Sequence, residues 1–77
     1  MAVVRWVNRE KHRYYTAALV EDLFQAPCLI TAWGGIGSRR GGTRSQAFPC
    51  EQEAWRALEA LRRRRRRRGY MEIATSL

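Results

Sequence analysis

Acidic residues are scarce in this chain of 77 residues, where seven aspartates and glutamates stand against fifteen lysines and arginines. The resulting net charge of +8 and the pI near 11.0 indicate a polyanionic partner. The candidate polyanions are DNA, RNA and an anionic membrane surface. Solubility in an arginine-rich protein is the alternative explanation of the same charge.

Long apolar runs are also absent. No segment approaches the roughly 18 consecutive apolar residues that a membrane helix needs. The first residues lack the apolar region and the cleavage site of a signal peptide. We therefore expect a cytoplasmic protein without a membrane partner.

Cysteine and histidine are rare, since the chain holds only Cys28, Cys50 and His12. A zinc site needs about four ligands at characteristic spacing, so we expect neither a metal nor a cofactor. No serine or cysteine has a plausible base partner, and no Gly-Lys-Ser/Thr follows the glycines to form a Walker A loop. We expect no catalytic residues and no enzyme activity.

The length allows one domain, residues 1–77, with a core of about 3–70. Alternating apolar and polar residues predict strands, which span residues 2–9, 13–20, 28–33 and 43–48. Pro27 is expected to start the third strand. In the loop 21–27, Leu23 and Phe24 are expected to tuck over the edge of the core.

A helix is expected after Pro49, because glutamates begin the following segment, arginines end it and Gly69 is a natural stop. Ala54, Ala57, Leu58 and Leu61 share one face of that helix. The last residues, 70–77, form either a fifth strand or a tail. The fold class is therefore α+β: an antiparallel sheet of four to five strands with one amphipathic helix, from the C-terminal half, packed on one face.

A glycine-rich segment, expected to form a turn over residues 34–42, follows Trp33. Trp33 is either a core or edge aromatic, or a stacking surface for a base or sugar of a nucleic acid. Backbone amides between Gly34 and Gly37 could hold phosphates. The side chains expected to do the same are those of Arg39, Arg40 and Arg44.

The order of these features resembles the WGR domain, which is named for a Trp-Gly-Arg triplet and occurs in poly(ADP-ribose) polymerases and in many small bacterial proteins. The resemblance covers roughly residues 5–70 and rests on Arg13-Tyr14-Tyr15, Asp22-Leu23-Phe24, Trp33-Gly34, Ser45 to Phe48, Glu53-Ala54 and Gly69-Tyr70. It implies that Trp33 contacts a DNA end. The chain departs from the family at Gly35, where the triplet has arginine, and at Gln25, where the turn has glycine.

An unbroken run of arginines, Arg62 to Arg68, ends the predicted helix. On a helical wheel Arg65 falls within the apolar face, so its stem should lie on the core and its guanidinium should reach the sheet edge. Arg63, Arg66 and Arg67 point away and are expected to bind nucleic acid. Besides Arg65, the residues expected to have structural roles are Gly37, Gly69 and Tyr70.

Two functions follow from these patterns. The first is a non-catalytic module that binds nucleic acid through Trp33, Gly34, Gly35 and the basic residues. The resemblance to the WGR domain implies DNA more than RNA, and DNA ends or nicks in particular. The alternative is a protein-interaction module for an acidic partner or a neighbouring domain, or a general binder of polyanions or RNA. The sequence leaves the oligomeric state open.

Overall fold

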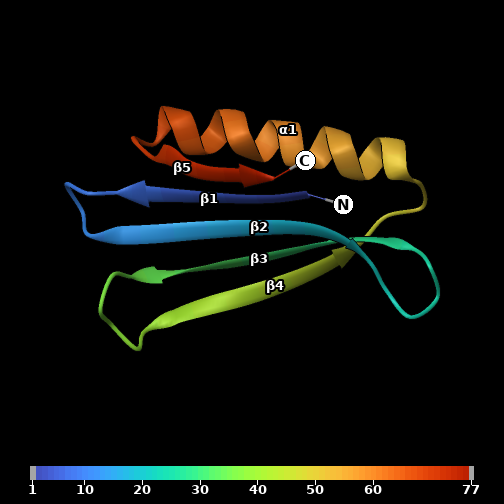
Figure 1. Ribbon diagram of the computed structural model, residues 1–77, viewed down its shortest axis with the longest axis horizontal. Helices are drawn as coiled ribbons and strands as arrows, with labels where there is room; N and C mark the ends of the chain where they lie inside the picture. Colours follow the sequence, from blue (N-terminus) through green and yellow to red (C-terminus); the bar gives the residue numbers. More distant parts are fainter. Residues whose placement is uncertain (1, 77) are drawn as a thin grey trace.

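The computed structural model describes residues 2–76 and has the predicted α+β fold. Its elements are β1 (Ala2–Asn8), β2 (Arg13–Glu21), β3 (Pro27–Gly35), β4 (Gly41–Ala47), α1 (Glu51–Arg67) and β5 (Met71–Ser76). The five strands form one antiparallel sheet in the order β4-β3-β2-β1-β5 (Figure 1). The segment predicted as strand or tail is a strand, although Leu77 and Met1 lie outside the described residues.

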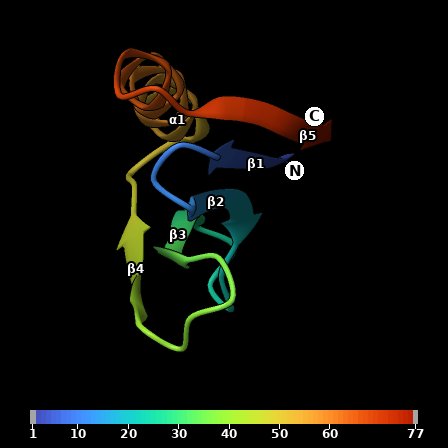
Figure 2. The ribbon, with the colours of Figure 1, turned by 90° about the vertical axis from the view of Figure 1, so that its left-hand side faces the viewer.

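The core lies between α1 and one face of the sheet. Strands β1 and β2 bury alternate residues on that face, as their sequence pattern predicts. The buried apolar residues are Ala2, Val4, Trp6, Ala17, Leu19 and Leu29 of the sheet and Ala54, Leu58 and Leu61 of the helix. Figure 2, which looks along the strands, shows α1 on one side of the sheet. Side chains of both the helix and the strands therefore line that side.

The helix stops where the sequence predicts. Arg68 is the C-cap and Gly69 follows with φ of +85°, a conformation that favours glycine. The backbone N–H of Tyr70 donates to the carbonyl of Arg65 at 3.0 Å, which closes the last turn. Buried Asn8 donates from Nδ2 to the Arg68 carbonyl at 3.3 Å, so β1 fixes the end of α1.

The glycine-rich turn is shorter than the predicted span of 34–42, because β3 continues to Gly35 and β4 begins at Gly41. Glycine is needed there for close approach of two paired strands. A Cβ atom on Gly41 would lie 2.2 Å from the Trp33 carbonyl oxygen, and one on Gly34 would lie 2.7 Å from the Arg40 carbonyl oxygen. Within the turn that remains, Gly37 has φ of +75°.

The expectation that Leu23 and Phe24 cover the core edge is wrong, since they are 98% and 89% exposed. Their turn is held by polar contacts instead of apolar burial. The Oδ1 atom of Asp22 accepts hydrogen bonds from the backbone N–H groups of Phe24 (2.8 Å) and Ala26 (2.9 Å). The turn therefore holds its shape without burying either apolar side chain.

Gln25 completes this turn with φ of +62°, the left-handed conformation that glycine adopts freely. We expect Gln25→Gly to raise the free energy of unfolding by about 0.5–1 kcal/mol, because relief of the backbone strain exceeds the added chain entropy. Thermal and urea unfolding measure this. Gln52→Gly, in the exposed first part of α1, is the matched control and should destabilise by about 1 kcal/mol. If Gln25→Gly destabilises the domain, the backbone of Gln25 is not strained in this turn.

The edge strand β5 is tied to α1 by an ion pair that the sequence did not reveal. Arg62 donates from Nε to Oε1 of Glu72 at 2.7 Å and from Nη2 to Oε2 at 3.1 Å. This hydrogen bonding by Arg62 lowers the pKa of Glu72 below its usual 4.5, against the opposing effect of burial. The same guanidinium contacts Glu59 at 3.2 Å, but Glu59 is the more exposed partner.

The Glu72 ion pair should make stability depend on pH. Because the folded-state pKa is lowered, its contribution is complete above the unfolded-state pKa and is lost as the pH falls through the folded value. Glu72→Gln should therefore destabilise the domain near pH 7, and the difference from the wild type should shrink below about pH 4.5. Urea unfolding across pH measures it. Glu59→Gln is the control, and an equal effect of the two substitutions would contradict the assignment.

Candidate nucleic-acid interface

Trp33 lies near the end of β3 on the face of the sheet that carries α1. Its ring is nearly parallel to that of Tyr15, its partner on β2, with centroids 5.9 Å apart and an interplanar angle of 16°. On the other side it covers Gly42 of β4, where a Cβ atom would lie 2.7 Å from the indole. The indole is therefore held from both sides, yet 37% of the residue remains exposed.

Tyr15 joins this indole to the core. Its ring meets Trp6 edge-on at 5.8 Å and Tyr70 edge-on at 6.3 Å. The Cζ atom of Arg65 lies 4.4 Å from the Tyr15 centroid and 5.2 Å from that of Tyr70, within the range of cation–π attraction. The guanidinium of Arg65 was expected at the sheet edge and instead covers these rings.

These side chains surround a cavity of about 340 Å³, which we call the aromatic pocket. Its lining residues are Arg13, Tyr15, Trp33, Gly34, Gly35, Arg40, Gly41, Arg65 and Tyr70. Three are arginines and none is acidic, so the pocket combines aromatic surface with positive charge. The Nε atom of Arg65 is buried and, among residues 2–76, has no hydrogen-bond partner.

The structure brings together only part of the predicted site. Trp33, Gly34, Gly35 and Arg40 meet in the aromatic pocket, beside Arg65 and Tyr70. Arg39 lines a second cavity to which Trp33 and Arg40 also contribute. The remaining predicted arginines lie elsewhere: Arg44 between sheet and helix, Arg63 beside Trp55 on α1, and Arg66 and Arg67 exposed at the helix end. Of the expected backbone donors, the N–H of Ile36 is already bonded to the His12 carbonyl at 2.8 Å.

Arg13 was not predicted as a site residue. It pairs directly with Gly35 across β2 and β3, and both residues line the aromatic pocket. The exposed side chain of Arg13 thus starts beside the position where the chain has glycine instead of the triplet's arginine. Side chains two residues apart in a strand lie on the same face, so Arg13 shares the face of Tyr15. This period could have identified Arg13 from the sequence.

The arginines of the helix end are not equivalent. We expect Arg65→Ala to lower the free energy of unfolding by about 1–2 kcal/mol, because it removes a packed stem and two cation–π contacts. Arg63→Ala and Arg67→Ala change exposed side chains and should stay within about 0.5 kcal/mol of the wild type. Thermal unfolding compares the three. Equal melting temperatures would contradict the packing of Arg65.

Over residues 2–76, no group of three or more His, Cys, Asp or Glu side chains is placed to hold a metal ion. The one helix of that part of the chain is not long and apolar enough to cross a membrane.

Comparison with known proteins agrees with the resemblance seen in the sequence. The model of the family described as WGR domain matches residues 2–76. A protein of Sinorhizobium fredii (strain NBRC 101917 / NGR234), described as uncharacterized protein y4dW, is 36% identical over 63 residues, covering 82% of this chain and 30% of that protein. The chain thus spans less than a third of that relative's length. No solved structure matches the chain significantly. The chain belongs to the WGR-domain family.

Proposed function

We propose that this domain is a non-catalytic module that binds DNA, in preference to RNA, at an exposed terminus such as an end or a nick. The observation that carries the proposal is the aromatic pocket, in which a partly exposed indole is flanked by three arginines. WGR domains are generally nucleic-acid-binding modules in proteins of the poly(ADP-ribose) polymerase type, rather than catalytic domains.

The chemistry of the pocket suits a nucleic-acid terminus. The exposed part of Trp33, 37% of the residue, offers a contact surface for a base or sugar, and base–aromatic stacking contributes about 1–3 kcal/mol for each base. Arg13 and Arg40 supply guanidinium groups that bind phosphate oxygens. A base inside a duplex is already stacked on both sides, so the indole can be reached only by a terminal or unpaired nucleotide.

The salt dependence of binding tests the electrostatic part of this proposal. If Z phosphates are neutralised, log K against log salt has a slope of about −0.9Z on duplex DNA, and we expect Z of roughly 3–6. Fluorescence anisotropy should compare blunt duplex, nicked duplex, single-stranded DNA and RNA at fixed salt. A flat salt response, or equal affinity for nicked duplex and for a duplex with covalently closed ends, would contradict the proposal.

The opposite face of the sheet supports a second candidate, a protein-interaction surface. The cross-strand neighbours Val3, Ala18 and Ile30 lie on that face, and Val3 and Ile30 are 40% and 41% exposed. Within residues 2–76 the only helix lies on the other side (Figure 2). Association through this face would be insensitive to salt, and Ile30→Lys would abolish it while leaving DNA binding unchanged. Sedimentation velocity of the wild type and of Ile30→Lys, each with and without a candidate partner domain, measures this association.

A further inference from the structure

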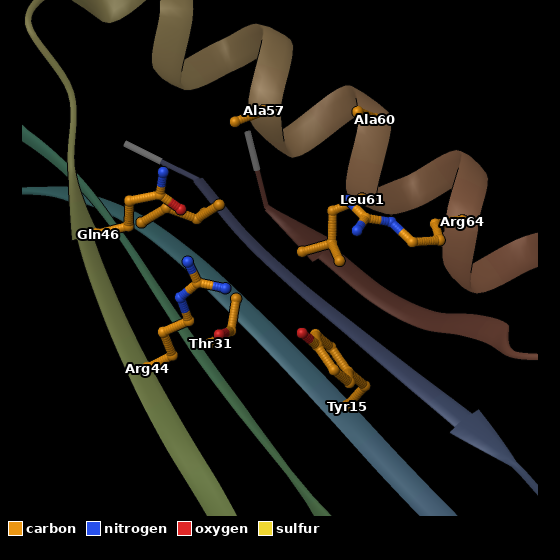
Figure 3. A pocket seen from close by; sticks show the side chains of 9 residues that line it. Tyr15, Thr31, Arg44, Gln46, Ala57, Ala60, Leu61 and Arg64 are labelled. Atoms are coloured by element: carbon orange, nitrogen blue, oxygen red, sulfur yellow. The ribbon is translucent and has the colours of Figure 1, made fainter.

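A second cavity, of about 160 Å³, lies between α1 and strands β3 and β4, and we call it the helix–sheet pocket. Its lining residues are Tyr15, Leu29, Thr31, Arg44, Gln46, Ala57, Ala60, Leu61 and Arg64. Tyr15 lines both pockets: its ring contacts Trp33, and its hydroxyl faces the helix–sheet pocket (Figure 3). The two pockets are thus neighbours with different chemistry.

Polar groups from sheet and helix converge on the helix–sheet pocket. Figure 3 shows the guanidinium groups of Arg44, on β4, and Arg64, on α1, directed into it together with the hydroxyls of Tyr15 and Thr31. The side-chain amide of Gln46 completes the set. Both ion pairs of the described residues are made by Arg62, so neither Arg44 nor Arg64 has a carboxylate partner there.

The helix leaves room for a ligand at this point. Ala57 and Ala60 are small, so their side chains leave space between α1 and the sheet. A gap lined by apolar groups would stay dry, whereas one lined by donors can hold water or a polar ligand. Two guanidinium groups facing one space repel each other unless a negative charge lies between them. Because Arg44 and Arg64 are exposed, water and salt screen part of this repulsion, and a bound oxyanion would reduce it further.

We propose that the helix–sheet pocket binds a single phosphate group, through Arg44 and Arg64 with hydrogen bonds from the Tyr15 and Thr31 hydroxyls. Guanidinium groups match the geometry of phosphate oxygens, and hydroxyls donate to the remaining ones. The pocket has less than half the volume of the aromatic pocket, 160 against 340 Å³, so it suits a phosphate group better than a base. This inference does not depend on DNA binding at Trp33.

Inorganic phosphate is the probe for the test, in thermal and urea unfolding at constant ionic strength with chloride as the reference. A ligand that binds only the folded state lowers the unfolding constant by the factor 1 + [L]/Kd, about eleven-fold at ten times Kd. We expect this stabilisation in the wild type and its loss in Arg44→Met/Arg64→Met. Tyr15→Phe, which removes only the hydroxyl, should weaken phosphate binding several-fold. The control Arg56→Met removes an exposed charge elsewhere on α1 and should respond like the wild type.

Phosphate also stabilises proteins generally by exclusion from their surface, so the double variant measures that background. Equal stabilisation of the wild type and the Arg44→Met/Arg64→Met variant would overturn the proposal. Because the unliganded double variant could differ in stability, backbone amide shifts of Thr31 and Gln46 on phosphate addition provide a second measurement. Unchanged shifts in the wild type would also overturn it.

Adding DNA distinguishes the source of the phosphate group. If the pocket takes a phosphate of the nucleic-acid backbone, inorganic phosphate and single-stranded DNA should compete, and the double variant should bind DNA more weakly. If it takes the phosphate of a small ester, both ligands should bind together. Either result supports a phosphate site. If DNA binding fails while phosphate still stabilises the protein, the proposed function is refuted and the phosphate site stands, because Trp33 does not line the helix–sheet pocket.

Discussion

Replacing Trp33 by alanine is expected to weaken binding to a DNA end by about 1–3 kcal/mol, or roughly 5- to 150-fold in Kd. The substitution removes the exposed part of the indole while leaving Arg13, Arg40 and Arg65 around the pocket. Much of the indole is packed on Tyr15 and Gly42, so some loss of stability should accompany it. Binding is therefore measured by anisotropy well below the melting temperature of each variant.

Trp55→Ala is the matched control for Trp33→Ala. Trp55 is a partly buried tryptophan packed against the core from α1, and it does not line the aromatic pocket. Its replacement should cost stability without changing affinity for DNA. Trp33→Phe keeps an aromatic face and should retain most of the binding. Unchanged affinity in Trp33→Ala, or an equal loss in Trp55→Ala, would contradict the stacking role.

The second large effect is expected at the pair formed by Arg13 and Gly35. If Arg13 supplies the guanidinium that the triplet's arginine provides in other WGR domains, Arg13→Ala should weaken DNA binding by about 1.5–3 kcal/mol. It should also reduce the magnitude of the salt slope by about 0.9, the contribution of one phosphate contact. Anisotropy titrations over a range of salt concentrations measure both quantities.

Gly35→Arg in the Arg13→Ala background tests the same idea by rescue. Gly35 has no left-handed φ, and a Cβ atom there would meet the Ser38 Cβ at 3.1 Å, so a small shift of Ser38 admits the side chain. The double variant should recover most of the lost affinity. Arg56→Ala, which removes an exposed charge on α1 outside the pocket, provides the control. If Gly35→Arg restores nothing on blunt or nicked DNA, Arg13 does not stand in for the missing arginine.

The sequence predicts the elements of this fold well because each follows from local chemistry. Alternation places Val4 and Trp6 on the buried face of β1, and the helical period places Leu58 and Leu61 against them. Gly69 predicts the end of α1 because a left-handed residue must follow it there. Hydrophobicity predicts burial of Leu23 and Phe24, but the carboxylate of Asp22 determines the turn and both side chains are exposed.

The candidate site was predicted less completely because it depends on how elements meet. Trp33 could be singled out from its glycines, but its stacking on Tyr15 depends on the pairing of β2 with β3. Arg44 and Arg64 line the same pocket only because of where α1 crosses the sheet. The arginine run identified positive charge without showing that Arg62 is bound to Glu72 and Arg65 to two aromatic rings.

Indole N–H resonances in a proton–nitrogen correlation spectrum test the role of the aromatic pocket most directly. The chain has three tryptophans: Trp33 in the pocket, Trp6 buried in the core and Trp55 on α1. On titration with a short blunt duplex, the Trp33 resonance should shift most and follow the binding isotherm, while that of Trp55 stays unchanged. A Trp33 resonance that does not move at saturating DNA, or a shift confined to Trp55, would contradict binding at this pocket.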